Sequence, residues 1–311
     1  MIKQILSCDW GTTSFRLRLV HAESAVVLAE IIEGKGIAAV YRDWIQSGLP
    51  ENERTNFYKS ILQTHIDKFT ESELTGVPLI ISGMASSSIG VTELPYSDCP
   101  FKINAENLQV MKLDCRENFK HDILLVSGLK TDNDVMRGEE TMLLGCETDE
   151  EQLIIFPGTH SKHVTIKNRL CVNFKTYMTG EVFELLATES ILSKSVVKNK
   201  SNQYNGIFEA AVQQAAAGNL LNTAFHVRTN QLFKKLSAEE NYHYLSGLVI
   251  GTELKDMVTA DKKIQLVCNR QLAEPYLLAL KILKGGSEVK YSNADEALIK
   301  GHCKLADILL K

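Results

Sequence analysis

One short pattern occurs twice in this sequence and constrains its fold more than any other feature. An apolar run over 2–8 leads into a glycine turn at 9–13 (DWGTT), and two further strands are predicted over 15–19 and 26–31. The same order returns at 153–174, where the turn reads PGTHSK. The two Gly-Thr pairs lie 147 positions apart (158 − 11), close to half of the 311 residues. The sequence therefore predicts one structural unit that is used twice.

The remaining segments mix strands and helices. Short apolar runs predict buried strands at 78–81, 123–126 and 264–268. Helices are predicted at 57–69, 134–144, 181–192, 207–224, 244–257, 274–283 and 294–310, with a loop at 285–287. This mixture gives an α/β class. Both glycine turns join a strand to a strand, whereas the P-loop joins a strand to a helix, and its G-x-x-x-x-G-K-[ST] motif is absent.

Length and charge limit the classes of function. A chain of 311 residues favours two domains. The net charge of −4 and the pI of about 6.1 give no basic face for nucleic acid, and no basic run suits a membrane surface. No stretch approaches the ~18–20 apolar residues of a membrane span, and the first apolar run is too short for a signal peptide. Seven cysteines without a C-x-x-C pair favour a reduced, cytoplasmic location.

The first glycine turn has the residue types of a phosphate-binding loop. A tight turn with glycine exposes backbone N–H groups that can cradle phosphate oxygens, and the hydroxyls of Thr12 and Thr13 add donors. Asp9, at the end of a buried strand, can hold Mg²⁺ directly or through water. A hairpin with ordinary polar turn residues is the alternative, and the matching turn in the second half favours the phosphate interpretation.

Several further stretches are those of one family. They are 134–141 (DVMRGEET), 157–162 (PGTHSK), Thr176 with 178–181 (MTGE), Phe183, Leu185, Leu186, and 245–248 (LSGL) followed by Gly251 and Glu253. With the D-x-G-T-T turn, they make the sequence resemble the 2-dehydro-3-deoxygalactonokinase family of the sugar kinase, Hsp70 and actin superfamily. The M-R-G-E-E-T and P-G-T-H-S-K stretches are specific, whereas D-x-G-T belongs to the superfamily.

The resemblance implies a fold and an activity. It implies two ribonuclease H-like lobes of the actin-like ATPase and sugar kinase type with a central nucleotide cleft. The lobes are expected at 1–137, joined by the C-terminal helix 294–311, and at 138–293. The implied reaction uses ATP and Mg²⁺ to phosphorylate a hydroxyl of a 2-keto-3-deoxy sugar acid, foremost 2-dehydro-3-deoxy-D-galactonate. The expected partners are these small molecules and, as an option, a second copy of the chain.

The resemblance also assigns nucleotide-binding residues. Those expected to contact the nucleotide are Gly11, Thr12, Thr13, Gly158, Thr159, Ser161, Lys162, Gly247 and Gly251. For Lys162 the alternative is a solvated lysine at a strand edge. For Gly247 and Gly251 it is close packing between helices. The adenosine side departs from the family, because Asn269-Arg270-Gln271 follows the strand 264–268 where a glycine is usual.

One carboxylate should orient the sugar hydroxyl. Related sugar kinases place an aspartate seven positions before a helix-ending glycine, but counting back from Gly145 lands on Gly138. Asp134 is preferred, because a helix N-terminus beside a ligand suits an anionic group. Its alternative role is that of a helix N-cap. Glu139 and Glu140 are the substitutes, either as the base or as Mg²⁺ ligands.

The sugar side is assigned to a loop after a buried strand, where α/β sheets carry ligand contacts. Its expected contacts are Gly83, Met84, Ser87, Glu93 and Tyr96. The family has arginine, glutamine and tryptophan where this chain has Ser88, Ile89 and Val91, so the natural partner of a substrate carboxylate is missing. Arg16 could replace it, or could lie on a solvated face.

Two other functions stay open. A phosphohydrolase on the same scaffold would use Glu139 or Glu140 to activate water. A degenerate kinase would bind a sugar or nucleotide without turnover. The H-x-x-H pair of His160 and His163 is not expected to hold zinc, since it falls in a turn entering a strand rather than on a helix.

Overall fold

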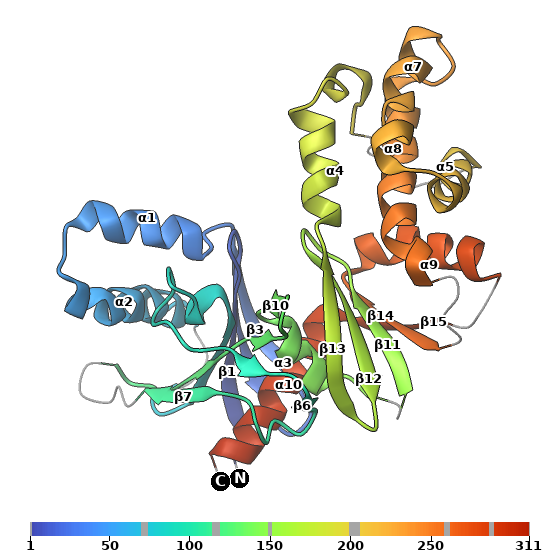
Figure 1. Ribbon diagram of the computed structural model, residues 1–311. Helices are drawn as coiled ribbons and strands as arrows, with labels where there is room; N and C mark the ends of the chain where they lie inside the picture. The colour runs from blue at the N-terminus through green and yellow to red at the C-terminus, as the bar shows by residue number, and fades with distance from the viewer. Residues whose placement is uncertain are drawn as a thin grey trace. The chain divides into compact units, whose positions relative to one another are not determined.

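The computed structural model describes residues 2–69, 74–113, 119–148, 151–198, 206–257, 262–285 and 289–310. The chain forms two compact units (Figure 1). Unit 1 comprises Met1–Asp149, Lys167–Asn173 and Ala294–Lys311, and unit 2 comprises Glu150–Ile166 and Phe174–Asn293. Unit 1 therefore includes residues 138–149, which the sequence places in the second lobe, together with the C-terminal helix, which it places in the first.

The main sheet of unit 1 has the strand order β3-β2-β1-β4-β8-β7. Its members are β1 (Gln4–Trp10), β2 (Phe15–His21), β3 (Val26–Glu33), β4 (Leu79–Gly83), β7 (Val110–Leu113) and β8 (Ile123–Val126). The first three strands are antiparallel, whereas β4 runs parallel to both β1 and β8. The strands predicted at 2–8, 15–19, 26–31, 78–81 and 123–126 are confirmed. The uninterrupted apolar runs of β4 and β8 are buried along their whole length, as expected for central strands.

Two helices, α1 (Ile37–Ser47) and α2 (Arg54–Ile66), pack with this sheet around one core. The sequence predicts α2 at 57–69 but gives no helix for α1. The signal for α1 was present: Ile37, Val40 and Trp44 have helical spacing and are buried, and Gly48 ends the helix at φ 65°.

A second layer of unit 1 contains α3 (Glu139–Gly145) and α10 (Ala294–Leu309), which Figure 1 shows side by side. A Cβ on Gly145 would lie 1.7 Å from the carbonyl oxygen of Ala297, so only glycine allows this approach. The helix predicted over 134–144 is wrong at its start. Residues Val135–Met136 form the strand β10 instead, because they pair with β9 (Leu129–Lys130).

Short elements complete unit 1. They are β5 (Ser97–Asp98), which joins β9 and β10 in a three-stranded sheet, β6 (Phe101–Lys102), and the 3₁₀ turns Glu51–Glu53 and Met84–Ser86. The first residues of β13 (Leu170–Tyr177), which belong to unit 1, pair with β6.

A buried histidine fastens α10 to the main sheet of unit 1. His302 lies between the hydroxyls of Ser7 on β1 (2.7 Å from Nδ1) and Ser82 on β4 (3.0 Å from Nε2). The side chain is fully buried, and burial, helped by the positive charge of Arg18, lowers the pKa of His302 to about 3. The imidazole is therefore neutral in the folded protein at neutral pH.

This histidine predicts a pH dependence of stability. Its pKa is lower in the folded chain than in the unfolded one, so its stabilising effect is complete above about pH 6.5 and declines as the pH falls toward 3. Between pH 7 and pH 4 we expect a loss of about 3 kcal/mol in the free energy of unfolding from this group. Urea unfolding at several pH values should show a shallower decline in His302→Gln than in wild type. An equal decline in the two proteins would contradict this role of His302.

Unit 2 has a sheet in the order β15-β14-β11-β12-β13. Its strands are β11 (Glu151–Phe156), β12 (Ser161–Lys167), β14 (Lys263–Cys268), β15 (Val289–Asn293) and the later residues of β13. The predicted strands at 153–156, 163–166, 170–174 and 264–268 are confirmed. The α/β class predicted for the chain is confirmed as well, since both units combine helices with a sheet.

The helices of unit 2 follow the predicted order with two differences. They are α4 (Thr179–Thr188), α5 (Gly206–Ala217), α6 (Leu220–Thr223), α7 (His226–Leu232), α8 (Ala238–Leu254) and α9 (Arg270–Lys284), with 3₁₀ turns at Ser193–Ser195 and Lys255–Met257. The helix predicted at 207–224 is two helices, because Asn219 begins α6 as its N-cap. Helix α7 is not predicted. Of the predicted loop at 285–287, only Gly285 lies within the described residues.

None of the helices within the described ranges has the length and apolar character that a membrane crossing requires.

Candidate active site

The first glycine turn is held by the start of α1. The carbonyl oxygens of Gly11 and Thr12 accept hydrogen bonds from the backbone N–H groups of Ile37 (2.9 Å) and Ala38 (3.1 Å). In a trans peptide the N–H points opposite to the C=O, so the amides of Thr12 and Thr13 point away from the helix. Both threonines are exposed, and no described residue accepts a hydrogen from these amides. The turn therefore offers free donors for an anion.

Gly36 makes this arrangement possible, although no motif in the sequence singles it out. It is the N-cap of α1, and a Cβ there would lie 2.5 Å from backbone atoms of Thr12 and Thr13. Only glycine lets the helix approach the turn so closely. One sequence signal for Gly36 was available: it directly precedes the helically spaced apolar residues Ile37, Val40 and Trp44.

The second glycine turn is held in the same way by α4. The carbonyl oxygen of Thr159 accepts from the backbone N–H of Glu181 (3.1 Å), and a Cβ on Gly180 would lie 2.7 Å from the Cα of Thr159. The amide of His160 consequently points away from α4. Gly158 is half-buried and Thr159 exposed. The order strand, glycine turn, strand, strand, helix thus occurs once in each half of the chain, with a glycine at each helix–turn contact.

Ser161 does not offer its hydroxyl as predicted. It is fully buried, and its Oγ donates to Oε1 of Glu253 (2.6 Å). The same oxygen accepts from Nε2 of His163 (2.7 Å), and Oε2 accepts from the hydroxyl of Tyr276 (2.5 Å). Burial raises the pKa of Glu253, but the hydrogen bonds and charge of His163, with the bond from Ser161, outweigh it and hold the pKa below its usual range. The expected phosphate contact at 161 is replaced by a buried network that ties β12 to α8 and α9.

The other predicted residues of this turn differ in exposure. Lys162 is only 5% exposed, and its Nζ donates to the carbonyl oxygen of His160 (3.1 Å), so it is not a solvated lysine. His160 contacts Glu181, whereas His163 belongs to the Glu253 network. Among the described residues, no group of three or more histidine, cysteine or acidic side chains could hold a metal ion.

Gly247 and Gly251 lie in the packing of α8 against α5. A Cβ on Gly247 would lie 2.6 Å from the carbonyl oxygen of Phe208, and one on Gly251 would lie 2.9 Å from Cβ of Ala215. Both glycines therefore have the packing role that was their alternative. Asn269, where the family usually has glycine, caps α9 by accepting from the backbone N–H of Leu272 (3.0 Å).

In unit 1, Asp9 forms an ion pair at the end of β1. Its Oδ2 lies 2.8 Å from Nη1 of Arg16, directly opposite in the β1–β2 register. The two side chains are 20% and 35% exposed. Burial raises the pKa of Asp9, and the Arg16 charge partly offsets that shift. Arg16 is thus paired with Asp9, and its role as the substitute for the missing sugar-acid arginine stays a prediction.

Two glycines with positive φ bring the M-R-G-E-E-T stretch to this strand end. Gly83 (φ 84°) ends β4, and a Cβ there would lie 2.8 Å from the carbonyl oxygen of Trp10 and 3.5 Å from Oδ1 of Asp9. Gly138 (φ 109°) precedes α3, and a Cβ there would lie 3.6 Å from the Cα of Gly83. The beginning of α3 thus lies beside the carboxyl ends of the parallel strands β1 and β4, where α/β sheets place ligands.

The three candidate carboxylates have different surroundings. Asp134 lies in a turn before β10, where its carbonyl oxygen accepts from Thr131, so the helix N-terminus invoked for it is wrong. Glu140 is fully buried, and its oxygens accept from the N–H of Gly138 (2.6 Å) and the hydroxyl of Thr141 (2.9 Å). Burial, and next the neighbouring Glu139, raise the pKa of Glu140 to about 7. Glu139 is half-buried in the first turn of α3.

The predicted sugar loop folds back on itself. Ser87 is buried and its hydroxyl donates to the carbonyl oxygen of Met84 (2.7 Å), so that hydroxyl is used within the loop. Met84 is half-buried, and Glu93 is exposed. Tyr96 carries the guanidinium of Arg137 over its ring at 4.2 Å. Arg137 is not among the predicted sugar contacts, although it lies inside the M-R-G-E-E-T motif.

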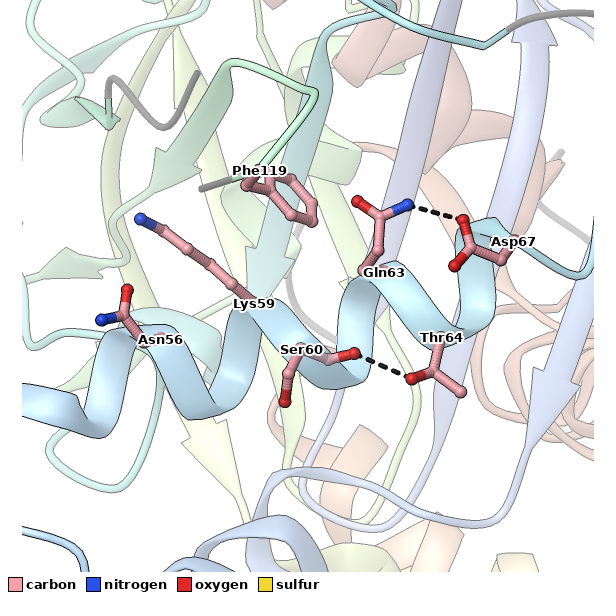
Figure 2. A pocket seen from close by; sticks show the side chains of 7 residues that line it. All are labelled: Asn56, Lys59, Ser60, Gln63, Thr64, Asp67 and Phe119. Carbon is pink, nitrogen blue, oxygen red and sulfur yellow. Dashed lines mark hydrogen bonds between the residues drawn. The ribbon is translucent and has the colours of Figure 1, made fainter. Parts of the chain in front are cut away.

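Two hollows of unit 1 contain none of these residues. One of about 490 Å³ runs along the outer face of α2, where Gln63 donates to Asp67 (2.7 Å) and Thr64 to the carbonyl oxygen of Ser60 (2.9 Å) (Figure 2). The other, of about 1280 Å³, is lined by β-strand ends and α10 residues such as Lys300 and Lys304.

Comparison with known proteins supplies an independent finding. Residues 9–305 match the family model described as 2-keto-3-deoxy-galactonokinase. The probable 2-dehydro-3-deoxygalactonokinase of Rhizobium meliloti (strain 1021) is 32% identical, over 94% of this chain and 93% of that protein. The 2-dehydro-3-deoxygalactonokinase of Escherichia coli (strain K12) is 26% identical, over 97% of each chain. A crystal structure of a putative 2-dehydro-3-deoxygalactonokinase from Sinorhizobium meliloti superposes with a TM-score of 0.83 at 29% identity, covering 98% and 97% of the two chains. The predicted sugar kinase fold is confirmed, because the chain shares its fold with that structure over nearly its whole length.

Proposed function

The chain belongs to the 2-keto-3-deoxy-galactonokinase family, and from this premise we propose that it phosphorylates a hydroxyl of a 2-keto-3-deoxy sugar acid with Mg-ATP. The preferred substrate is 2-dehydro-3-deoxy-D-galactonate. The observation that carries the proposal is the family match over residues 9–305, which includes both glycine turns and the M-R-G-E-E-T stretch. The six cysteines within the described residues are free thiols, which suits action in the reducing cytoplasm.

The residues for ATP follow from the free donors. Within unit 1 the proposed donors to phosphate oxygens are the amides and hydroxyls of Thr12 and Thr13. Within unit 2 they are the amide of His160 and the hydroxyl of Thr159. Asp9 fits as a ligand of Mg²⁺, since it is an ionisable oxygen ligand beside the first turn, with Arg16 as its partner in the absence of the ion. Bound ATP supplies the transferred phosphoryl group, and Mg²⁺ neutralises its charge. Ser161, Gly247 and Gly251 are not part of this proposed site.

Glu139 is the proposed base. It stands in the first turn of α3, beside Gly138 and hence beside the ends of β1 and β4. Glu140 is fully buried whereas Glu139 is half-buried, and Asp134 lies outside the helix. A carboxylate in Glu139's position can accept the proton of the sugar hydroxyl as the phosphoryl group is transferred.

The contact between Gly36 and the first turn gives a prediction for ATP binding. Gly36→Ala should push α1 against the backbone of Thr12 and Thr13 and displace the free amides. Overpacking of this kind costs about 1–3 kcal/mol, so we expect ATP affinity to fall about tenfold in calorimetry. Gly34→Ala is the matched control, because nothing lies within 4 Å of a Cβ at that position. Equal affinities in the two variants would contradict the proposed role of the turn.

One assay separates the proposed function from its rivals. The purified protein would be incubated with Mg-ATP and, in parallel, 2-dehydro-3-deoxy-D-galactonate, its C4 epimer, a five-carbon 2-keto-3-deoxy acid or no sugar. We expect ADP release that depends on a sugar acid, together with a phosphorylated product in mass spectrometry. Equal phosphate release without sugar would identify a hydrolase. ATP binding without turnover on any acid would identify a binding protein.

A further inference from the structure

Arg137 is fixed on two sides within unit 1. Its Nη1 donates both to the carbonyl oxygen of Ser86 (2.7 Å) and to the Ser86 hydroxyl (2.6 Å). Its guanidinium plane lies over the ring of Tyr96 at 4.2 Å. A guanidinium that is bonded at one nitrogen and stacked on a ring has little rotational freedom left, so the orientation of its other donors is set before any ligand binds.

These contacts leave the Nε–Nη2 edge of the guanidinium unpaired, and this is the edge that matches a carboxylate. In a guanidinium, the Nε–H and one Nη2–H lie parallel on the side away from Nη1, and this fork matches the two oxygens of a carboxylate. Nε is buried, and neither it nor Nη2 has an acceptor among the described residues. A buried donor without a partner costs about 1–3 kcal/mol, and a bound ligand that supplied the acceptor would remove this cost.

We propose that the Nε–Nη2 edge of Arg137 binds the carboxylate of the sugar-acid substrate, an assignment that rests on the proposed kinase function. Arg137 would then supply the positive charge that the family has at position 88, where this chain has serine. Arg137 directly precedes Gly138 beside Gly83, and its backbone N–H donates to Oε2 of Glu139 (3.1 Å). A substrate anchored at Arg137 therefore lies next to the proposed base.

Other arginines near the loop do not fit this role. Arg16 is paired with Asp9. The fork of Arg54 is filled, because its Nε donates to the carbonyl oxygen of Gly90 (3.0 Å) and its Nη2 to that of Ser88 (2.5 Å). Arg54 also lies 5.3 Å from the ring of Tyr41. It resembles Arg137 in burial and stacking but lacks the free edge, which makes it a matched control.

The test compares binding of a charged and a neutral ligand. Calorimetry in the presence of Mg²⁺ and a non-hydrolysable ATP analogue would give dissociation constants for 2-dehydro-3-deoxy-D-galactonate and for its methyl ester. In Arg137→Gln we expect affinity for the acid to fall about 100-fold, and affinity for the ester to change less than threefold, since charge-assisted bonds to the carboxylate are lost. Arg137→Lys should be intermediate, because it keeps the charge without the fork. Arg54→Gln should keep the wild-type ratio of acid to ester affinity.

The outcomes separate the inference from the function. Wild-type protein that phosphorylates the acid, combined with an unchanged acid-to-ester ratio in Arg137→Gln, would overturn the carboxylate assignment alone. An equal fall for acid and ester would also overturn it, since it would show only a structural role. Wild-type protein that binds ATP but neither binds nor phosphorylates any sugar acid would overturn the proposed function and this inference with it.

Discussion

Glu139→Gln is expected to lower kcat for the sugar acid by about 10²–10⁴-fold while leaving ATP affinity unchanged. Glutamine keeps the size of the side chain but cannot accept the proton of the hydroxyl. Residual sugar-dependent turnover would come from positioning of the substrates and from charge neutralisation. Steady-state kinetics with saturating Mg-ATP, together with calorimetry for ATP, would measure both quantities.

Two neighbouring carboxylates are the controls for this prediction. Asp134→Asn should retain kcat within a few-fold, because Asp134 lies in the turn before β10 rather than in α3. Glu140→Gln should act mainly on thermal stability, because the Glu140 carboxylate is buried and bonded to Gly138 and Thr141. Full activity in Glu139→Gln with a large loss in Asp134→Asn would return the base to Asp134.

The largest expected loss of stability is that of Glu253→Ala. The carboxylate is 1% exposed. It accepts hydrogen bonds from Ser161 and His163 on β12 and from Tyr276 on α9. Removing it leaves three buried donors without an acceptor. Breaking a buried pair of this kind costs about 3–5 kcal/mol, and urea unfolding would measure it. The exposed Glu239→Ala, on the same helix α8, should cost less than about 1 kcal/mol.

The pH dependence of unfolding tests the same network. Because the folded pKa of Glu253 lies below its unfolded value of about 4.3, its contribution is complete above about pH 5 and declines as the pH falls through the lower folded value. Glu253→Gln should therefore show a smaller loss of stability between pH 5 and pH 3 than wild type. An identical decline in both proteins would show that Glu253 is not bound as a carboxylate.

Local sequence patterns were sufficient to predict the segments whose conformation depends mainly on residues adjacent along the chain. The uninterrupted apolar runs predicted β4 and β8, and the D-x-G-T-T turn between alternating strands predicted the first hairpin. Helix α3 is the opposite case. The helix was predicted from residue 134, but residues 135–136 pair with β9, and β9 in turn pairs with β5 (Ser97–Asp98), which lies in an earlier stretch of the sequence.

The candidate site divides along the same line. The sequence alone determined which stretches matter, because the glycine turns and the M-R-G-E-E-T motif can be recognised residue by residue. The tertiary structure alone decided which atoms in them are free. Ser161 and Arg16 are paired with Glu253 and Asp9, whereas the Nε–Nη2 edge of Arg137, which Ser86 and Tyr96 hold in place, has no acceptor among the described residues. A hydrogen bond depends on which groups meet in space, and the order of residues does not specify that meeting.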